Sequence, residues 1–180
     1  MLIPGTHLGL VAGKEGSIYL LDTNNMGHYN NGNNNNAVQF LPSILGATSN
    51  GGTDENFSTA SYFNGNIYYI GDHDTIQQFA FNGTLSTAPI DHSLDLYDEL
   101  GAQPIISANG TKNAILWAIE YVAGGTSGQL RAYDATNLAN ELYTTSLANF
   151  GGAVKFSVPT VVNGKVYVGT QDKLVIFGNL

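Results

Sequence analysis

The sequence predicts an all-β protein, a β-propeller with about four blades of four antiparallel strands each. Composition is the first indication: 22 of the 180 residues are glycine, only 11% are charged, and tyrosine and phenylalanine together number 18. Such a composition is typical of β proteins with many turns. The second indication is a strand–turn–strand pattern that recurs four times, and the third is the Asn-Gly pairs and alternating apolar residues within it.

The repeat is clearest where residues 58–83 are compared with residues 157–180. Each segment contains a short apolar strand, an Asn-Gly turn, a strand with a central tyrosine, a polar turn and a third strand. Spacings of 58, 54 and 44 residues separate the third-strand anchors, which are Ile18, Ile76, Leu130 and Leu174. Periods of this size, with several strands per unit, are typical of propeller blades. We therefore predict blades at residues 1–45, 58–90, 104–147 and 157–180.

The first two blades follow from short apolar runs between turns. In the first blade we expect strands at 1–4, 8–12, 17–22 and 38–41. In the second we expect them at 58–63, 67–71, 75–81 and 85–88. Asn64-Gly65 separates the first two strands of the second blade. This pair suits a type I′ turn, which needs positive φ at both central residues.

The last two blades repeat this order. In the third blade we expect strands at 105–108, 114–120, 129–134 and 141–145, with Asn109-Gly110 opening a longer turn. In the fourth we expect strands at 158–162, 165–170 and 174–177, with a type I′ turn at Asn163-Gly164. No fourth strand is expected there.

The final blade therefore lacks its rim strand, and the segment 1–4 already reads as the inner strand of the first blade. This arrangement indicates the C-terminal part of a longer propeller, or one half of an assembled ring of about eight blades. Each end would expose a sheet face and free strand edges, which favour association. We expect the remaining blades of a longer chain, or a second copy in a homo-oligomer, to cover these ends.

Four segments resemble the PQQ-like, or quinoprotein-type, propeller repeat: GKEGSIYLLDTNNMG, SANGTKNAILWAIE, LRAYDATN and VPTVVNGKVYVGT. The resemblance covers nearly all of the chain outside residues 30–52. It implies a propeller fold and a bacterial protein in an extracellular or periplasmic location. For the alcohol dehydrogenases of the family it also implies PQQ with calcium.

The chain departs from those dehydrogenases in two ways. They close each repeat with a tryptophan, whereas here Tyr143 stands at that position in the third blade and the sole tryptophan, Trp117, lies in an earlier strand. They also carry a vicinal cysteine pair over the quinone, and this chain has no cysteine. The resemblance therefore implies the fold, and we assign no catalytic residue and expect no cofactor.

Charge and composition reduce the number of functions that the chain could have. The net charge of −8, with no cluster of lysine or arginine, argues against nucleic acid. No apolar run approaches the roughly 18 residues that span a bilayer. Three functions remain: a non-catalytic binding or scaffold module for a carbohydrate or protein ligand, a fragment of a PQQ- and calcium-dependent alcohol or sugar oxidoreductase, and a glycan-processing enzyme. We favour the first, because no catalytic set can be placed on the chain.

Two short polar stretches are candidate metal sites. Asp72, His73 and Asp74 are all capable of binding metal, but the side chains of consecutive residues diverge, so a polar hairpin turn explains them better. The segment 22–27 is oxygen-rich, as calcium loops are, but lacks their alternating acidic residues, which favours an Asx-type turn. The segment 134–137 is expected to form the same kind of turn.

Two further features are candidate surfaces. The asparagine-rich segment 28–40 favours a solvent loop, with a binding loop as the alternative. Asp95, Asp98 and Glu99 are expected to form a solvated acidic surface, because a glycosidase would need a second carboxylate cluster.

Aromatic residues in the second and third strands of each repeat are expected to fill the interfaces between blades. They are Tyr19, Tyr68 or Tyr69, Trp117 and Tyr167.

Overall fold

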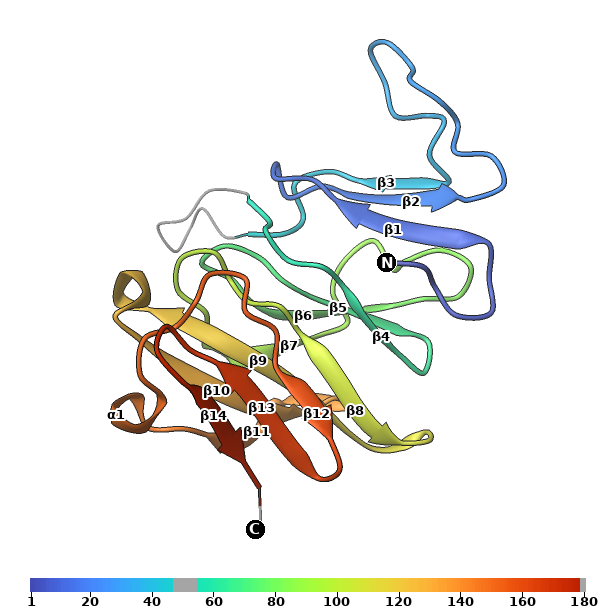
Figure 1. Ribbon diagram of the computed structural model, residues 1–180. Helices are drawn as coiled ribbons and strands as arrows, with labels where there is room; N and C mark the ends of the chain where they lie inside the picture. Colours follow the sequence, from blue (N-terminus) through green and yellow to red (C-terminus); the bar gives the residue numbers. More distant parts are fainter. Residues whose placement is uncertain (47–54, 179–180) are drawn as a thin grey trace.

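The computed structural model describes residues 1–46 and 55–178 and contains four antiparallel β-sheets that follow one another along the chain (Figure 1). The first sheet consists of β1 (Leu8–Ala12), β2 (Ile18–Asp22) and β3 (Gln39–Leu41). The second consists of β4 (Ser61–Phe63), β5 (Asn66–Ile70), β6 (Thr75–Ala80) and β7 (Asp91–Leu96). In both, neighbours in sequence are neighbours in the sheet.

The third sheet consists of β8 (Ile105–Asn109), β9 (Lys112–Val122), β10 (Ser127–Asp134) and β11 (Asn137–Thr144). The fourth has three strands, β12 (Thr160–Val162), β13 (Lys165–Gly169) and β14 (Leu174–Phe177). A short helix, α1 (Leu147–Phe150), precedes the fourth sheet. The prediction of an all-β chain is confirmed. No helix in the described part is long and apolar enough to cross a membrane.

The Asn-Gly pairs form two of the tight turns as predicted. Asn64 and Gly65 have φ of 45° and 79°, and Asn163 and Gly164 have φ of 51° and 73°. Positive φ at both central residues is what a type I′ turn requires. The expectation of a longer turn at Asn109-Gly110 is wrong. Asn109 pairs with Lys112, so only two residues separate the strands, and a register shift after Ser107 absorbs the extra residue.

The rim strand of the second sheet is not where the sequence predicted it. The expected segment 85–88 contributes only an isolated bridge between Leu85 and Phe81, and the strand β7 begins at Asp91. Leu85 is buried and packs into the core between the first two sheets. The side chain of Gln39 holds Leu85 in place, because it donates to the Leu85 carbonyl at 2.9 Å and accepts from the Leu85 N–H at 2.7 Å.

Other strand boundaries also differ from expectation, and β4, for example, begins at Ser61 rather than at residue 58. The rim strand of the third sheet begins at Asn137, because Asn137 pairs directly with Asp134 across a tight turn. The strand β12 begins at Thr160 rather than at residue 158. The segment 1–4 forms one bridge, Leu2 to Gly9, beside β1.

Three apolar clusters fill the spaces between successive sheets. Leu10 and Leu20 of the first sheet pack with Tyr69 and Phe79 of the second. The second cluster joins the second and third sheets, and the third joins the third and fourth. None of these clusters of described residues joins the fourth sheet back to the first, and Figure 1 shows these two sheets at opposite ends of the array.

The strand β5 shows how one sheet serves two interfaces. Successive side chains of a strand point to opposite faces. Tyr68 and Ile70 therefore pack toward the third sheet, and Ile67 and Tyr69 pack toward the first. All four are essentially fully buried.

The aromatic residues expected at interfaces between blades divide into two groups. Tyr68 and Tyr69 fill the interfaces on either side of the second sheet, as expected, and Trp117 packs at the edge of the cluster between the third and fourth sheets. Tyr19 and Tyr167 are only partly buried. They lie on the outward faces of the first and fourth sheets, since their strand neighbours Leu20 and Val166 point inward.

Truncating a core ring should therefore cost far more than truncating an exposed one. We expect Phe79→Ala to lower the free energy of unfolding by about 3–5 kcal/mol, because it leaves a cavity between the first two sheets. Tyr29→Ala, which removes a largely exposed ring, should change it by less than about 0.5 kcal/mol. Urea unfolding followed by tyrosine and tryptophan fluorescence measures both. Similar losses in the two variants would contradict this packing.

Candidate functional site

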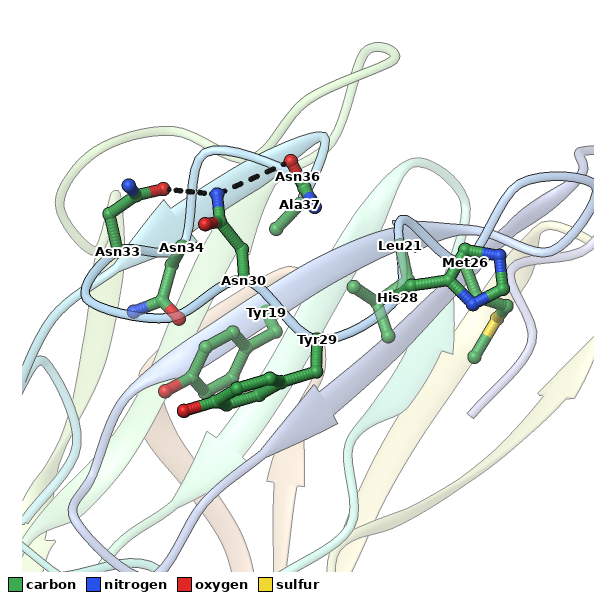
Figure 2. A pocket seen from close by; sticks show the side chains of 10 residues that line it. All are labelled: Tyr19, Leu21, Met26, His28, Tyr29, Asn30, Asn33, Asn34, Asn36 and Ala37. Carbon is green, nitrogen blue, oxygen red and sulfur yellow. Dashed lines mark hydrogen bonds between the residues drawn. The ribbon is translucent and has the colours of Figure 1, made fainter.

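A pocket opens where residues 23–38, which we call the asparagine loop, fold back over the outward face of the first sheet (Figure 2). Its volume is about 210 Å³. The lining combines two tyrosine rings, several amides and a few apolar side chains. These residues are Tyr19, Leu21, Met26, His28, Tyr29, Asn30, Asn33, Asn34, Asn36 and Ala37.

The strand β2 supplies the floor of the pocket. Ile18 and Leu20 are fully buried in the core, so the alternating side chains Tyr19 and Leu21 point outward. The Tyr19 ring lies 5.0 Å from the Phe40 ring, centroid to centroid, and its hydroxyl donates to Glu15 Oε1 at 2.9 Å. Burial raises the pKa of the Tyr19 hydroxyl above its ordinary value, and Glu15 adds to the increase. The hydroxyl is therefore neutral at neutral pH.

Asparagine side chains hold the loop in shape. Asn30 Nδ2 donates to Asn33 Oδ1 at 2.7 Å and to Asn36 Oδ1 at 3.5 Å, as Figure 2 shows. Asn36 Nδ2 in turn donates to the Gly27 carbonyl. Gly27 has φ of 78°, and a Cβ at this position would lie 2.5 Å from the Asn36 carbonyl oxygen. The close approach of the two ends of the loop therefore requires glycine.

Tyr29 forms the rim of the pocket. Its exposed fraction is 88%, so its ring contributes little to the core. The hydroxyl donates to Asn31 Oδ1 at 3.2 Å, which anchors the ring within the loop. In Figure 2 the Tyr29 and Tyr19 side chains lie on the same side of the pocket with their hydroxyls pointing the same way. The pocket thus offers aromatic surface next to neutral amides.

The candidate metal residues Asp72, His73 and Asp74 lie in the turn between β5 and β6, where the sequence placed a polar hairpin turn. Asp72 and Asp74 are buried. Asp72 Oδ1 accepts the N–H of Leu100 at 2.7 Å, and Asp74 Oδ2 accepts the N–H of Gly46 at 3.1 Å. The two carboxylates therefore connect this turn to two different loops.

His73 lies between two carboxylates. Its Nδ1 is 3.0 Å from Asp72 Oδ2, and its Nε2 is 3.7 Å from Asp98 Oδ1. Within residues 1–46 and 55–178, no group of three or more histidine, aspartate or glutamate side chains is arranged to hold a metal ion.

The two segments read as Asx-type turns have that geometry. Asp22 Oδ1 accepts the N–H of Asn24 at 2.9 Å. Asp134 Oδ1 accepts both the N–H and the hydroxyl of Thr136, at 2.8 Å and 2.6 Å. In each case the carboxylate closes a turn between strands.

The expectation of a solvated acidic surface is wrong for Asp95. This residue lies on β7, not in a loop, and it faces Arg131 Nη1 at 3.2 Å and the Tyr133 hydroxyl at 3.1 Å. Arg131 also contacts Glu120 and Glu141, each at 2.7 Å. Burial disfavours the charge of Arg131, but Glu120 and the other acidic partners outweigh it and raise the pKa of the guanidinium. This ion network joins the second and third sheets.

A second, more apolar cleft of about 520 Å³ lies between the third and fourth sheets. Trp117, Tyr143 and Phe177 supply its aromatic surface. The Trp117 Nε1 donates to Ser107 Oγ at 2.8 Å, and the Tyr143 and Phe177 centroids are 6.4 Å apart. Of these, sequence reasoning singled out Trp117 as an interface residue and Tyr143 only as a departure from the repeat.

Sequence reasoning also did not single out Tyr29, although it identified the loop as a binding alternative. The available signal was an aromatic residue inside an otherwise polar, turn-forming segment. Together the fold and the pocket define an all-β protein of four packed sheets with an aromatic and amide-lined pocket at one end. In comparisons with known proteins, no family model matches the chain and no curated protein matches its sequence.

Asp74 should give folding stability a pH dependence. Burial raises its pKa, although hydrogen bonds from Gln77, Thr75 and Gly46 oppose this. In the window between the ordinary pKa of aspartate and the raised value, the folded state binds a proton more readily than the unfolded state. The contribution of Asp74 to stability therefore rises as pH falls through this window.

We expect the stability of the wild type relative to Asp74→Asn to increase between pH 7 and pH 4. Urea midpoints at several pH values measure this difference. The same comparison for the exposed Asp172, as Asp172→Asn, supplies the control. If the stability of the wild type relative to Asp74→Asn falls as the pH is lowered, the raised pKa of Asp74 is wrong.

Proposed function

We propose that this chain is a non-catalytic binding module with a propeller-type architecture, and that the asparagine-loop pocket holds its ligand. Two observations support the architecture. Four antiparallel sheets follow one another along the chain, and successive sheets pack face to face through apolar clusters. Propeller blades are arranged in this way. The motif resemblance to the PQQ-like repeat points in the same direction, and with it comes the proposal of an extracellular or periplasmic location.

The chemistry of the pocket favours a neutral carbohydrate. Among the described residues, no aspartate, glutamate, lysine or arginine lines it, and the Glu15 carboxylate beside it already accepts a hydrogen bond from the Tyr19 hydroxyl. Each asparagine amide offers both donors and an acceptor, which match the hydroxyl groups of a sugar. The tyrosine rings offer apolar faces against which the C–H face of a sugar ring can pack. This combination of two tyrosines and four asparagines in an uncharged pocket is the observation that carries the proposal.

The size of the pocket agrees with a small ligand. Its volume of about 210 Å³ lies below the range of roughly 300–1,000 Å³ for sites that enclose drug-sized ligands. An open pocket of this size suits one or two sugar units of a longer chain. A protein ligand, the other class considered, would need a larger contact area than this pocket provides.

The alternative of a PQQ- and calcium-dependent oxidoreductase stays a prediction. Among the residues that the structure describes, no group of three or more histidine, aspartate or glutamate side chains is arranged to hold a metal ion, and we derive no step through the quinone or the metal. Adding PQQ and calcium to the purified protein, followed by assays for cofactor absorbance and dye-linked alcohol oxidation, tests this alternative directly.

Binding to neutral oligosaccharides should depend on the rim tyrosine. We expect Tyr29→Ala to weaken binding by about tenfold or more, because an exposed aromatic ring at a binding site contributes much of the affinity. Calorimetry with an oligosaccharide selected from a glycan array measures this change. Tyr143→Ala, which removes a half-exposed tyrosine far along the chain on β11, should bind like the wild type.

Two outcomes would contradict the proposal. One is the absence of binding to any neutral saccharide on the array. The other is equal weakening by Tyr29→Ala and Tyr143→Ala, which would show that the effect does not arise at the pocket.

A further inference from the structure

The outward faces of the first and fourth sheets are both apolar. On the first sheet, Leu2 is 72% exposed, and Val11 and Met26 are also exposed. On the fourth sheet, Leu174 is 62% exposed, and Val162 and Ile176 are also exposed. We call these surfaces the head face and the tail face. Apolar groups gathered on one face of a sheet mark an interaction surface.

The tail face repeats a face that is buried elsewhere in the same molecule. In the second sheet Ile70 pairs with Ile76, and in the fourth Gly169 pairs with Leu174. Both strand pairs follow a type I′ Asn-Gly turn, so Tyr167 occupies the position of Tyr68, and Leu174 occupies the position of Ile76. Tyr68 and Ile76 are fully buried against the third sheet.

The head face repeats the opposite face of the second sheet. Ala12 pairs with Ile18 just as Ile70 pairs with Ile76. Counting along the strands from these pairs, Val11 occupies the position of Tyr69, and Leu21 occupies the position of Phe79. Tyr69 and Phe79 are buried against the first sheet. The two end faces are therefore the two halves of the interface that the molecule already builds between successive sheets.

Charge also distinguishes the two ends. Lys165 shares the tail face with Tyr167, because alternate residues of β13 share a face. On the head face, the Tyr19 hydroxyl donates a hydrogen bond to the carboxylate of Glu15, which places a negative charge there. Opposite charges favour a head-to-tail contact over contacts between like faces.

We propose that two copies of this chain associate head to tail. The fourth sheet of each copy packs on the first sheet of the other copy. This contact has the same geometry as the contact between the first and second sheets within one chain. A two-fold pair of this kind covers both head faces and both tail faces and leaves no apolar end free. This assembly goes beyond the proposed ligand binding. Tyr19 and Leu21 of the head face also form the floor of the pocket under the asparagine loop, so the partner and a ligand would share this surface.

Charged substitutions on the two faces test the proposal. Sedimentation velocity of the wild type at micromolar concentration should give twice the 19.1 kDa of one chain. Val11→Asp on the head face and Ile176→Asp on the tail face should each weaken self-association by about tenfold or more, because each buries an unpaired carboxylate in an apolar contact. Leu142→Asp, at an exposed leucine on β11, should remain a dimer. Circular dichroism verifies that every variant is folded.

Mixing the two face variants distinguishes a head-to-tail contact from head-to-head and tail-to-tail contacts. The Val11→Asp chain keeps an intact tail face, and the Ile176→Asp chain keeps an intact head face. The mixture should therefore form a heterodimer through one intact contact, although neither variant dimerises alone. A monomeric wild type would overturn the proposal, as would growth into long polymers, a dimer that survives either face variant, or a mixture that stays monomeric. None of these readouts involves a saccharide, so failure here is separate from failure of ligand binding.

Discussion

Burial of both faces of the inner sheets is the constraint on which this structure depends. A strand covered on one side alternates apolar and polar residues, but a strand covered on both sides has no polar face to present. The strand β5 shows the result, since Ile67, Tyr68, Tyr69 and Ile70 are consecutive and buried. Where such a strand contains a polar atom, the atom needs a partner. The Tyr68 hydroxyl donates to the Ala135 carbonyl, in the turn between β10 and β11 of the neighbouring sheet, at 2.6 Å.

Packing by apolar faces alone would leave the sheets free to slide over one another, and the buried polar contacts remove that freedom. Arg131 of β10 reaches Glu120 and Glu141 within its own sheet and Asp95 on the second sheet. Asp91 of β7 accepts the N–H of Leu138 on β11 at 2.9 Å. Such directional contacts define one register between the second and third sheets, because any shift would leave buried charges and donors without partners.

Local signals in the sequence were sufficient to predict the positions of most of the strands. Asn64-Gly65 and Asn163-Gly164 identify two hairpins through their need for positive φ, and the apolar runs on either side identify the strands.

The features that sequence reasoning missed depend on long-range contacts. The strand β7 has the sequence DHSLDL, which has no clear strand pattern, and its position depends on pairing with β6 and packing beside β11. The role of Asp95 depends on Arg131, 36 residues later. The shape of the pocket depends on which asparagine bonds to which, and a run of similar amides does not specify that in advance.

The serial arrangement of the sheets has a consequence for how the molecule loses its structure. Within one chain, the apolar clusters of described residues join each sheet to its neighbours in the chain order, so stability resembles a sum of nearest-neighbour terms, as in repeat proteins. The second and third sheets have two neighbours each, whereas the first and fourth have one. In a single, unassociated chain, local opening should then begin at the ends, and amide hydrogens of β13 and β14 should exchange with solvent before those of β5, β6, β9 and β10. In this view the molecule frays from its outer sheets inward, and the two four-stranded sheets at its centre form the unit that opens last.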